Sequence, residues 1–147
     1  MDDYARYEAD CKKVRNLNKK LLTEFKNWLQ ASGLAEKTIK SHVSNIDFYI
    51  NEFLLYEEPV VKAEKGIGDV NMYLGYWFIK KAMWASKASI KSNAASLTKF
   101  YTFLLEKSLI ERDELNELKV TVKEKMPEWL ATLECYDDLS VEDVWEL

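Results

Sequence analysis

The chain has 147 residues, of which 48% are hydrophobic and 13% aromatic, and its formal net charge is −4. That length and hydrophobicity are enough for one domain with a core of its own, and they exclude a disordered tail. With only 4 Gly and 2 Pro the chain has few turn residues, so we expect an all-α bundle of four to five main helices joined by short loops.

Cysteine, histidine and hydropathy patterns exclude several other classes of protein. The chain has 2 Cys and 1 His and no CxxC pair, so no set of zinc ligands can form and we expect neither a metal nor a cofactor. Cys11 and Cys135 are expected to be reduced thiols of a cytoplasmic protein. The N-terminus is acidic and unlike a signal peptide, and no run reaches the ~20 apolar residues of a membrane span.

Charge is distributed unevenly along the chain. Residues 11–50 contain 8 basic and 3 acidic side chains, and residues 80–110 contain 6 lysines and one glutamate. Residues 111–147 contain 4 basic and 12 acidic side chains. A phosphate meets the local field and not the total charge, so two basic segments followed by an acidic tail are compatible with DNA binding.

The first half of the chain predicts two amphipathic helices. Leu17–Ala31 carries an apolar stripe and ends before Gly33, which suits a left-handed cap. Residues 2–16 are either a lead-in or an extension of this helix. A second helix is expected over Glu36–Leu55, with a polar and basic start formed by Lys37, Thr38, Lys40, Ser41 and His42. Lysines at a helix start oppose the helix dipole, so a phosphate-facing surface and an ordinary solvated face are equally good explanations of this pattern.

A loop and two more helices are expected next. Tyr56–Gly68 reads as the main loop, and Asp69 as the cap of a third helix over Val70–Trp84, which is apolar nearly all round. The clearest helix of the chain is Ser86–Ile110, with a Ser86 cap, a basic first part and an apolar later part.

The C-terminal part is predicted to be broken into short pieces. Glu111–Val122 reads as a short acidic helix or turn, Pro127 as an interruption, and Glu128–Cys135 as one more helical segment. Ser140 followed by Asp143 resembles a capping box, which predicts the start of a new helix there.

Two segments carry a family resemblance. The first contains Phe25, Trp28, Leu29, the run GLAEKTI from Gly33 to Ile39, Ile46, Phe53 and Leu54. The second contains Ser86, Ser89, Ile90, Leu97, Phe100, Tyr101, Phe103, Leu104, Leu109 and Ile110. In this order and spacing they resemble the N-terminal core-binding domain of tyrosine recombinases, the phage-integrase superfamily, a SAM-like helical bundle. Ala35 and Ser89 depart from the family pattern, which commonly has Ser or Thr at the first position and Thr at the second.

The resemblance implies a division of the chain into three parts. Residues 1–16 would be an N-terminal lead-in, residues 17–125 the core-binding-like domain, and residues 126–147 an acidic tail that looks like the entry to a missing catalytic domain. Since the catalytic domain of the family supplies the tyrosine nucleophile and its arginines and histidines, we expect this chain not to be an enzyme.

The implied function is binding of double-stranded DNA, mostly through the sugar-phosphate backbone. Lysines would neutralise phosphates, hydroxyl groups would hydrogen-bond to them, and Asn93 would reach a base edge. The residues predicted to bind DNA lie at two helix starts that face the same side: Lys37, Thr38, Lys40, Ser41, Lys87, Ser89, Lys91, Ser92 and Asn93. A less favoured hypothesis is that His42 also contacts a phosphate.

The alternative is a protein-interaction or vestigial domain with no role in DNA binding. Trp129 and Trp145 would then anchor a partner or a second copy, because tryptophan is enriched at interfaces. A further hypothesis is that the acidic tail folds over the basic helix starts and screens them.

Overall fold

The computed structural model describes residues 2–56 and 58–146, with residues 139–146 described by their backbone alone, and these residues are helical or in short turns. The elements in chain order are α1 (Asp3–Ala31), α2 (Glu36–Phe48), the π-helical turn η1 (Tyr49–Phe53), the 3-10 helix η2 (Ala63–Asp69), α3 (Val70–Met72), the π-helical turn η3 (Tyr73–Trp77), α4 (Phe78–Lys81), α5 (Lys87–Glu106) and α6 (Arg112–Glu146). The predicted all-α class is confirmed for the described residues.

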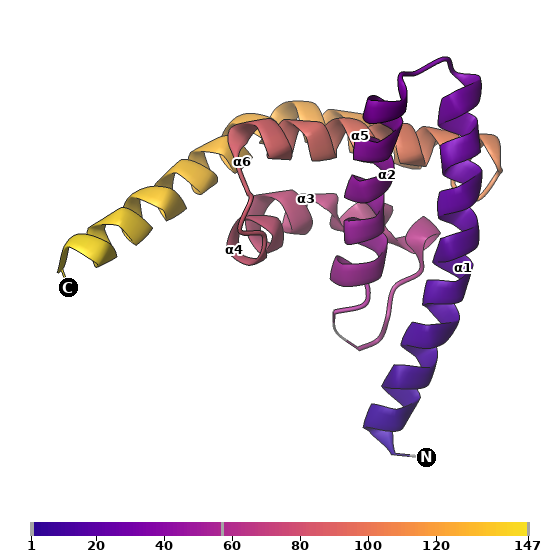
Figure 1. Ribbon diagram of the computed structural model, residues 1–147, viewed down its shortest axis with the longest axis horizontal. Helices are drawn as coiled ribbons and strands as arrows, with labels where there is room; N and C mark the ends of the chain where they lie inside the picture. The colour runs from indigo at the N-terminus through magenta and orange to yellow at the C-terminus, as the bar shows by residue number, and fades with distance from the viewer. Residues whose placement is uncertain (1, 57, 147) are drawn as a thin grey trace.

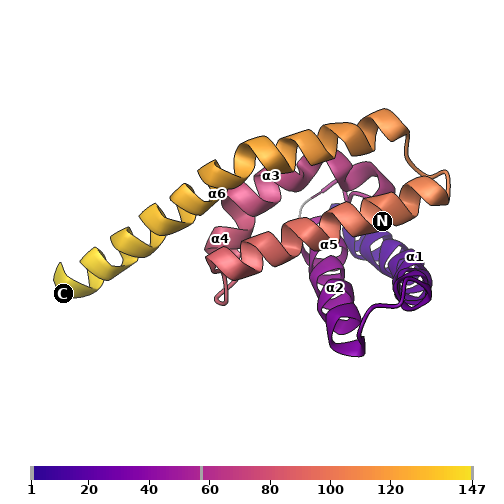
Figure 2. The same cartoon turned by 90° about the horizontal axis from the view of Figure 1, so that it is seen from above.

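The helices pack as two crossed pairs. In Figure 1, α1 and α2 lie side by side, and α5 crosses α2 at a steep angle. After a tight turn α6 runs back along α5, as Figure 2 shows, and its C-terminal part continues beyond the bundle. The short elements η2 and η3 pack against both α5 and α6, α3 packs against α6, and together they close the core from the other side.

The N-terminal residues extend the first helix. Asp2 caps α1 by accepting a hydrogen bond of 2.7 Å from the backbone N–H of Ala5, and the helix then continues without a break to Ala31. Its N-terminal half is tied to the end of η1, where the hydroxyl of Tyr7 donates to the carbonyl of Leu55 and Arg15 donates to the carbonyl of Asn51. Of the two interpretations of residues 2–16, the extension is therefore confirmed.

The region after α2 departs from the prediction. The expected loop over Tyr56–Gly68 contains a 3-10 helix, and the expected helix over Val70–Trp84 is a short α–π–α series that ends at Lys81. Asp69 makes no capping hydrogen bond. Buried tyrosine hydroxyls hold η2 in place, because Tyr101 donates to the carbonyl of Ala63 at 2.8 Å and Tyr49 donates to that of Gly66 at 2.5 Å.

The predicted division of the C-terminal part into short pieces is wrong. One helix, α6, covers all of them and passes through Pro127, and its backbone continues past Ser140 without a new start. Pro127 is exposed, so its ring and its missing N–H lie on the solvent side of the helix. Trp129 and Leu133 are buried on the inner side, so packing holds the helix together across the proline.

Candidate nucleic-acid interface

The start of α5 has the predicted cap. The hydroxyl of Ser86 accepts from the backbone N–H of Ser89 at 3.0 Å, and the hydroxyl of Ser89 accepts from the backbone N–H of Ser86 at 2.7 Å. The cap directs Ser89 toward the backbone of its own turn. Its side chain is therefore occupied by the helix start, and the predicted phosphate contact would have to displace these bonds.

Two further predicted residues of α5 face inward. Asn93 is only 3% exposed and donates to the carbonyl of Ser89 at 2.8 Å, so it does not reach toward a base edge as predicted. Ser92 is half-buried and accepts from the side chain of Asn45 at 3.1 Å. The physical reason is the crossing of α2 over α5, which turns this side of α5 into a helix–helix contact.

This contact is a polar seam, which we define as His42, Asn45, Ser92 and Ser96. Asn45 donates to the hydroxyl of Ser96 at 2.9 Å, and Nδ1 of His42 lies 2.7 Å from the same hydroxyl oxygen. Burial lowers the pKa of His42, and the nearby charge of Lys99 lowers it further. The hypothesis that His42 contacts a phosphate is therefore not supported, because the ring is buried within the fold.

The remaining predicted residues are all exposed: Lys37, Thr38, Lys40 and Ser41 on α2, and Lys87 and Lys91 on α5. The start of α2 has no side-chain cap, as the alanine at position 35 implies, so its first backbone N–H groups stay open to a ligand. These side chains can meet a phosphate without any change in the fold.

The two helix starts do not converge on one point. In the polar seam, His42 faces Ser96 while Asn45 faces Ser92, so moving toward the start of α2 means moving away from the start of α5. Figure 1 shows the consequence: both helices begin on the upper side of this view, α2 beside the turn from α1 and α5 at the opposite end beside α6. The predicted single cationic surface is therefore two separated groups.

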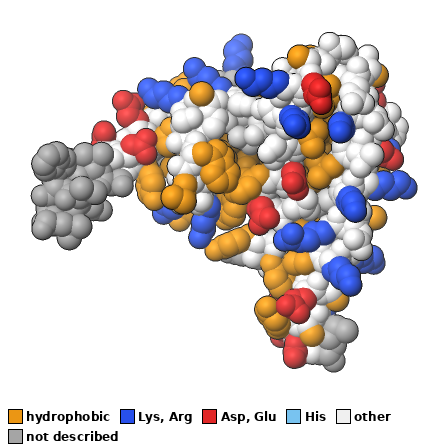
Figure 3. All heavy atoms as spheres, in the orientation of Figure 1, with side chains coloured by type: hydrophobic (Ala, Val, Ile, Leu, Met, Phe, Trp, Pro, Cys, Tyr) orange, Lys and Arg blue, Asp and Glu red, His pale blue; other side chains and the backbone are white. Residues whose placement is uncertain are grey.

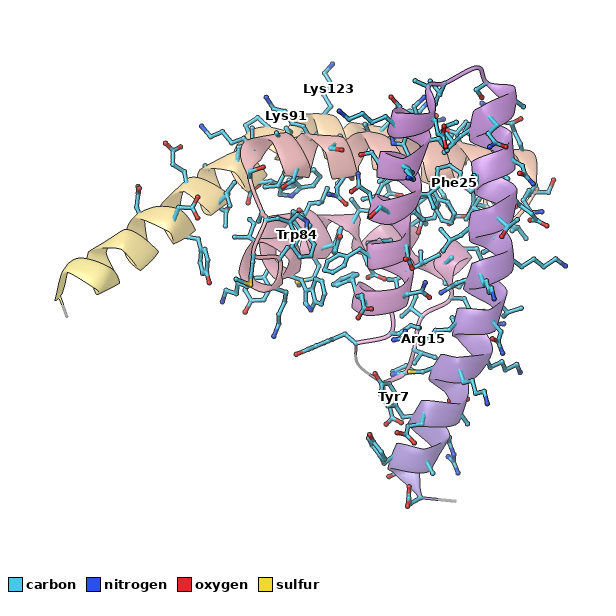
Figure 4. All side chains as sticks on the ribbon, viewed as in Figure 1. Tyr7, Arg15, Phe25, Trp84, Lys91 and Lys123 are labelled. Carbon is cyan, nitrogen blue, oxygen red and sulfur yellow. The ribbon has the colours of Figure 1, made fainter. Side chains whose placement is uncertain are left out.

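The structure adds cations that the sequence interpretation missed. Lys91 of α5 and Lys123 of α6 project to the same side, as Figure 4 shows, and basic side chains follow this edge of the space-filling view in Figure 3. Lys119 lies one helical turn before Lys123 on the exposed side of α6. Lys87 lies one helical turn before Lys91 on the exposed side of α5. We call this surface the basic ridge, and its members are Lys87, Lys91, Lys119 and Lys123.

The basic ridge is free of ion pairs with the described carboxylates. The two ion pairs between described residues are Lys107–Glu24 and Lys125–Glu128, and neither involves the ridge. The sequence interpretation missed Lys119 and Lys123 because it considered only the total charge of residues 111–147, where twelve acidic side chains outnumber them. Their spacing of four residues on one helix was the signal that could have placed them together.

The C-terminal helix does not screen these cations. Its last turns extend away from the bundle in Figures 1 and 2, so the hypothesis that the tail folds over the helix starts is wrong for the described backbone. Trp129 is 1% exposed and cannot anchor a partner, while the side chain of Trp145 lies outside the described part.

The described residues contain no cluster of His, Cys, Asp and Glu side chains that could hold a metal ion. None of their helices is long and apolar enough to cross a membrane. No protein-family model, curated protein or solved structure matches this chain, so the resemblance to tyrosine recombinases remains a prediction from the sequence.

Proposed function

We propose that this domain binds double-stranded DNA through the backbone phosphates, in the manner that its resemblance to a core-binding domain implies, and without catalysis of its own. The observation that supports this most is the basic ridge. Its lysines come from two antiparallel helices, are directed to one side, and have no carboxylate partner in the described part of the chain.

The dimensions of the ridge suit a phosphate backbone. Lys87 and Lys91 are four residues apart on α5, and Lys119 and Lys123 are four residues apart on α6, which corresponds to roughly 6 Å along each helix axis. Phosphates of one DNA strand follow each other every ~3.4 Å along the duplex axis, so each pair of lysines spans about two phosphate steps. Lysine is a compact point charge without the planar fork of arginine, so the ridge favours phosphate contacts over reading of bases.

The start of α2 provides a second group of contacts. Lys37 and Lys40 are exposed there, and the uncapped backbone N–H groups of this helix start suit an oxyanion. Because α2 and α5 begin at different places, we assign this group to a phosphate farther along the duplex than those on the ridge.

Fluorescence anisotropy with a labelled duplex of about 25 base pairs tests the proposal. Each phosphate contact contributes about −0.9 to the slope of log K against log salt, so three to five contacts predict a slope of about −3 to −4.5. Absence of any binding in 25 mM salt would contradict the proposal.

Variants locate the contact surface. We expect the double variant Lys91→Ala and Lys123→Ala to reduce the salt slope by about 2, since each lysine neutralises one phosphate. The matched control is the pair Lys12→Ala and Lys13→Ala on the exposed side of α1, which removes the same charge away from the ridge. Equal losses in both pairs would show nonspecific attraction and would reject the ridge as the binding surface.

A second candidate function is association with another protein, and one observation favours it. Large apolar side chains are exposed around η3, α4 and the turn before α5, where Met83 is 98% and Trp84 57% exposed, and Figure 3 shows apolar side chains gathered on this face. Exposed apolar patches commonly mark interaction sites. Light scattering of the wild type and of Met83→Ser at high concentration tests self-association, which the variant is expected to weaken.

A further inference from the structure

A pocket between η1, the loop that follows it and η3 has walls of aromatic rings. Phe53, Tyr56, Tyr76 and Trp77 line it, together with the flexible side chain of Met72, and its volume is about 410 Å³. The ring of Trp77 lies edge to face with Phe53 at 5.3 Å and with Tyr56 at 5.6 Å between centroids. We call it the aromatic pocket, and its size falls within the range of small-molecule sites.

Two carboxylates also line the aromatic pocket. Asp69 is half-buried, yet it neither caps the helix that follows nor forms an ion pair with a described residue. Glu58 lies at the exposed edge and is likewise outside the described ion pairs. Burial raises the pKa of Asp69, because desolvation disfavours its charged form. A cation beside this carboxylate would offset that cost.

The rings already attract cations from the chain itself. Nζ of Lys80 lies 4.3 Å from the ring centroid of Tyr76, and Nζ of Lys81 lies 5.1 Å from that of Tyr56. Both lysines are exposed, so their ammonium groups can move into solvent when another cation enters. Aromatic faces combined with unpaired carboxylates are the chemistry that binds quaternary ammonium groups.

We propose that the aromatic pocket binds a quaternary ammonium group, held by the faces of Tyr56, Tyr76 and Trp77 and by the carboxylate of Asp69. This site is independent of the DNA-binding proposal, because it shares no residue with the basic ridge. The aromatic rings supply cation–π attraction, and the carboxylate of Asp69 supplies a negative charge that attracts a cation but not a neutral apolar ligand.

An NMR titration compares choline with 3,3-dimethylbutan-1-ol, its neutral analogue of the same shape. Resonances of the Trp77 indole and of the Gly68 amide report on binding in the intact chain. Cation–π attraction of about 1.4 kcal/mol corresponds to a tenfold difference in affinity, so we expect choline to bind about ten times more tightly. Equal affinities would show an apolar pocket with no preference for a cation and would overturn the proposal, as would the absence of saturable shifts with choline.

Charge variants test the proposed countercharge. Asp69→Asn keeps the shape of the side chain and should weaken choline binding about fivefold, whereas the control Asp10→Asn on the exposed side of α1 should leave it unchanged. Lys81→Ala removes the competing ammonium group and should strengthen binding two- to threefold. Weaker choline binding by Lys81→Ala would mean that Lys81 holds the Tyr56 ring in place and does not compete with the ligand, and it would overturn the proposed exchange of ammonium groups.

A last comparison identifies the source of the ammonium group. Phosphocholine represents a lipid headgroup, and acetylated, amidated trimethyllysine represents a modified peptide. Tighter binding of either compound than of choline supports the proposal and identifies the carrier. Weaker binding of both, with choline still favoured over its neutral analogue, supports the proposal and restricts the ligand to small free quaternary ammonium compounds.

Discussion

Two contacts between helices fix the positions of α2, α5 and α6, and they differ in chemistry. The polar seam joins α2 to α5 through a histidine, an asparagine and two serines. The contact between α6 and η3, which we call the apolar seam, is centred on Trp129, packed against Gly75 and closed by one hydrogen bond of 2.8 Å to Asn71.

The difference between the two seams shows which polar side chains are used inside the fold and which stay exposed. The polar seam uses the hydroxyl groups of Ser92 and Ser96 for internal hydrogen bonds, and of the predicted DNA-binding residues of α5 only Lys87 and Lys91 remain exposed. The apolar seam fixes α6 across Pro127 and thereby positions Lys119 and Lys123 beside α5. We therefore expect the apolar seam to dominate stability and the polar seam to control the response to pH.

The largest effect is expected from Trp129→Ala. The side chain is 1% exposed, and truncation of a buried tryptophan typically costs about 3–5 kcal/mol in the free energy of unfolding. Urea unfolding followed by circular dichroism measures the loss. The control Trp84→Ala makes the same change at a residue that is 57% exposed and should cost about 1 kcal/mol. Similar losses in both variants would contradict the central role of the apolar seam.

A smaller effect is expected from Gly75→Ala. A Cβ atom at this position would lie 2.8 Å from Cδ1 of Trp129, so the buried indole ring would have to move. Overpacking costs about 1–3 kcal/mol, while the better helix propensity of alanine returns up to about 1 kcal/mol, so we expect a net loss of about 1–2 kcal/mol.

Gly68→Ala is the matched control for this substitution. It makes the same chemical change at a position with no atom within 4 Å of the added Cβ, so its unfolding midpoint in urea should stay close to that of the wild type. A Gly75→Ala protein as stable as the Gly68→Ala protein would show that the indole ring has room to move.

The sequence predicted α5 well because its signals are local. Ser86 and Ser89 cap it, and the apolar stripe marks its buried side from Ile90 to Leu104. The prediction for α6 was wrong because it considered the local cost of Pro127 alone. The packing of Trp129 against α3 and η3, more than fifty residues earlier in the chain, holds the helix together.

The candidate site was predictable only in part, for the same reason. Exposure of Lys37 and Lys91 follows from their places on amphipathic helices. The inward orientation of Ser92 and Asn93 depends on the crossing with α2, whose Asn45 lies 47 residues away from Ser92. No local pattern encodes that crossing, so serine and asparagine near a basic helix start were indistinguishable from phosphate ligands.

The smallest effect is expected from pH. Histidine is the one side-chain type whose ordinary pKa lies between pH 5.5 and 7.5. The chain has a single histidine, His42. Burial first and Lys99 second lower its pKa in the folded state below the usual 6.5. The unfolded chain therefore binds more protons in this range, and the free energy of unfolding should fall as the pH drops from 6.5 through the lowered folded value.

The variant His42→Gln separates this effect from the general response to acid. Glutamine keeps a hydrogen-bonding group opposite Ser96 but cannot be protonated, so its free energy of unfolding should vary less between pH 7.5 and 5.5 than that of the wild type. The contribution of Asp69 has the opposite sign, because burial raises its pKa from 3.8 in the folded state. Urea titrations of both proteins at the two pH values measure the difference. Parallel curves would show that the polar seam does not sense protons, because the imidazole would then titrate alike in the folded and unfolded chains.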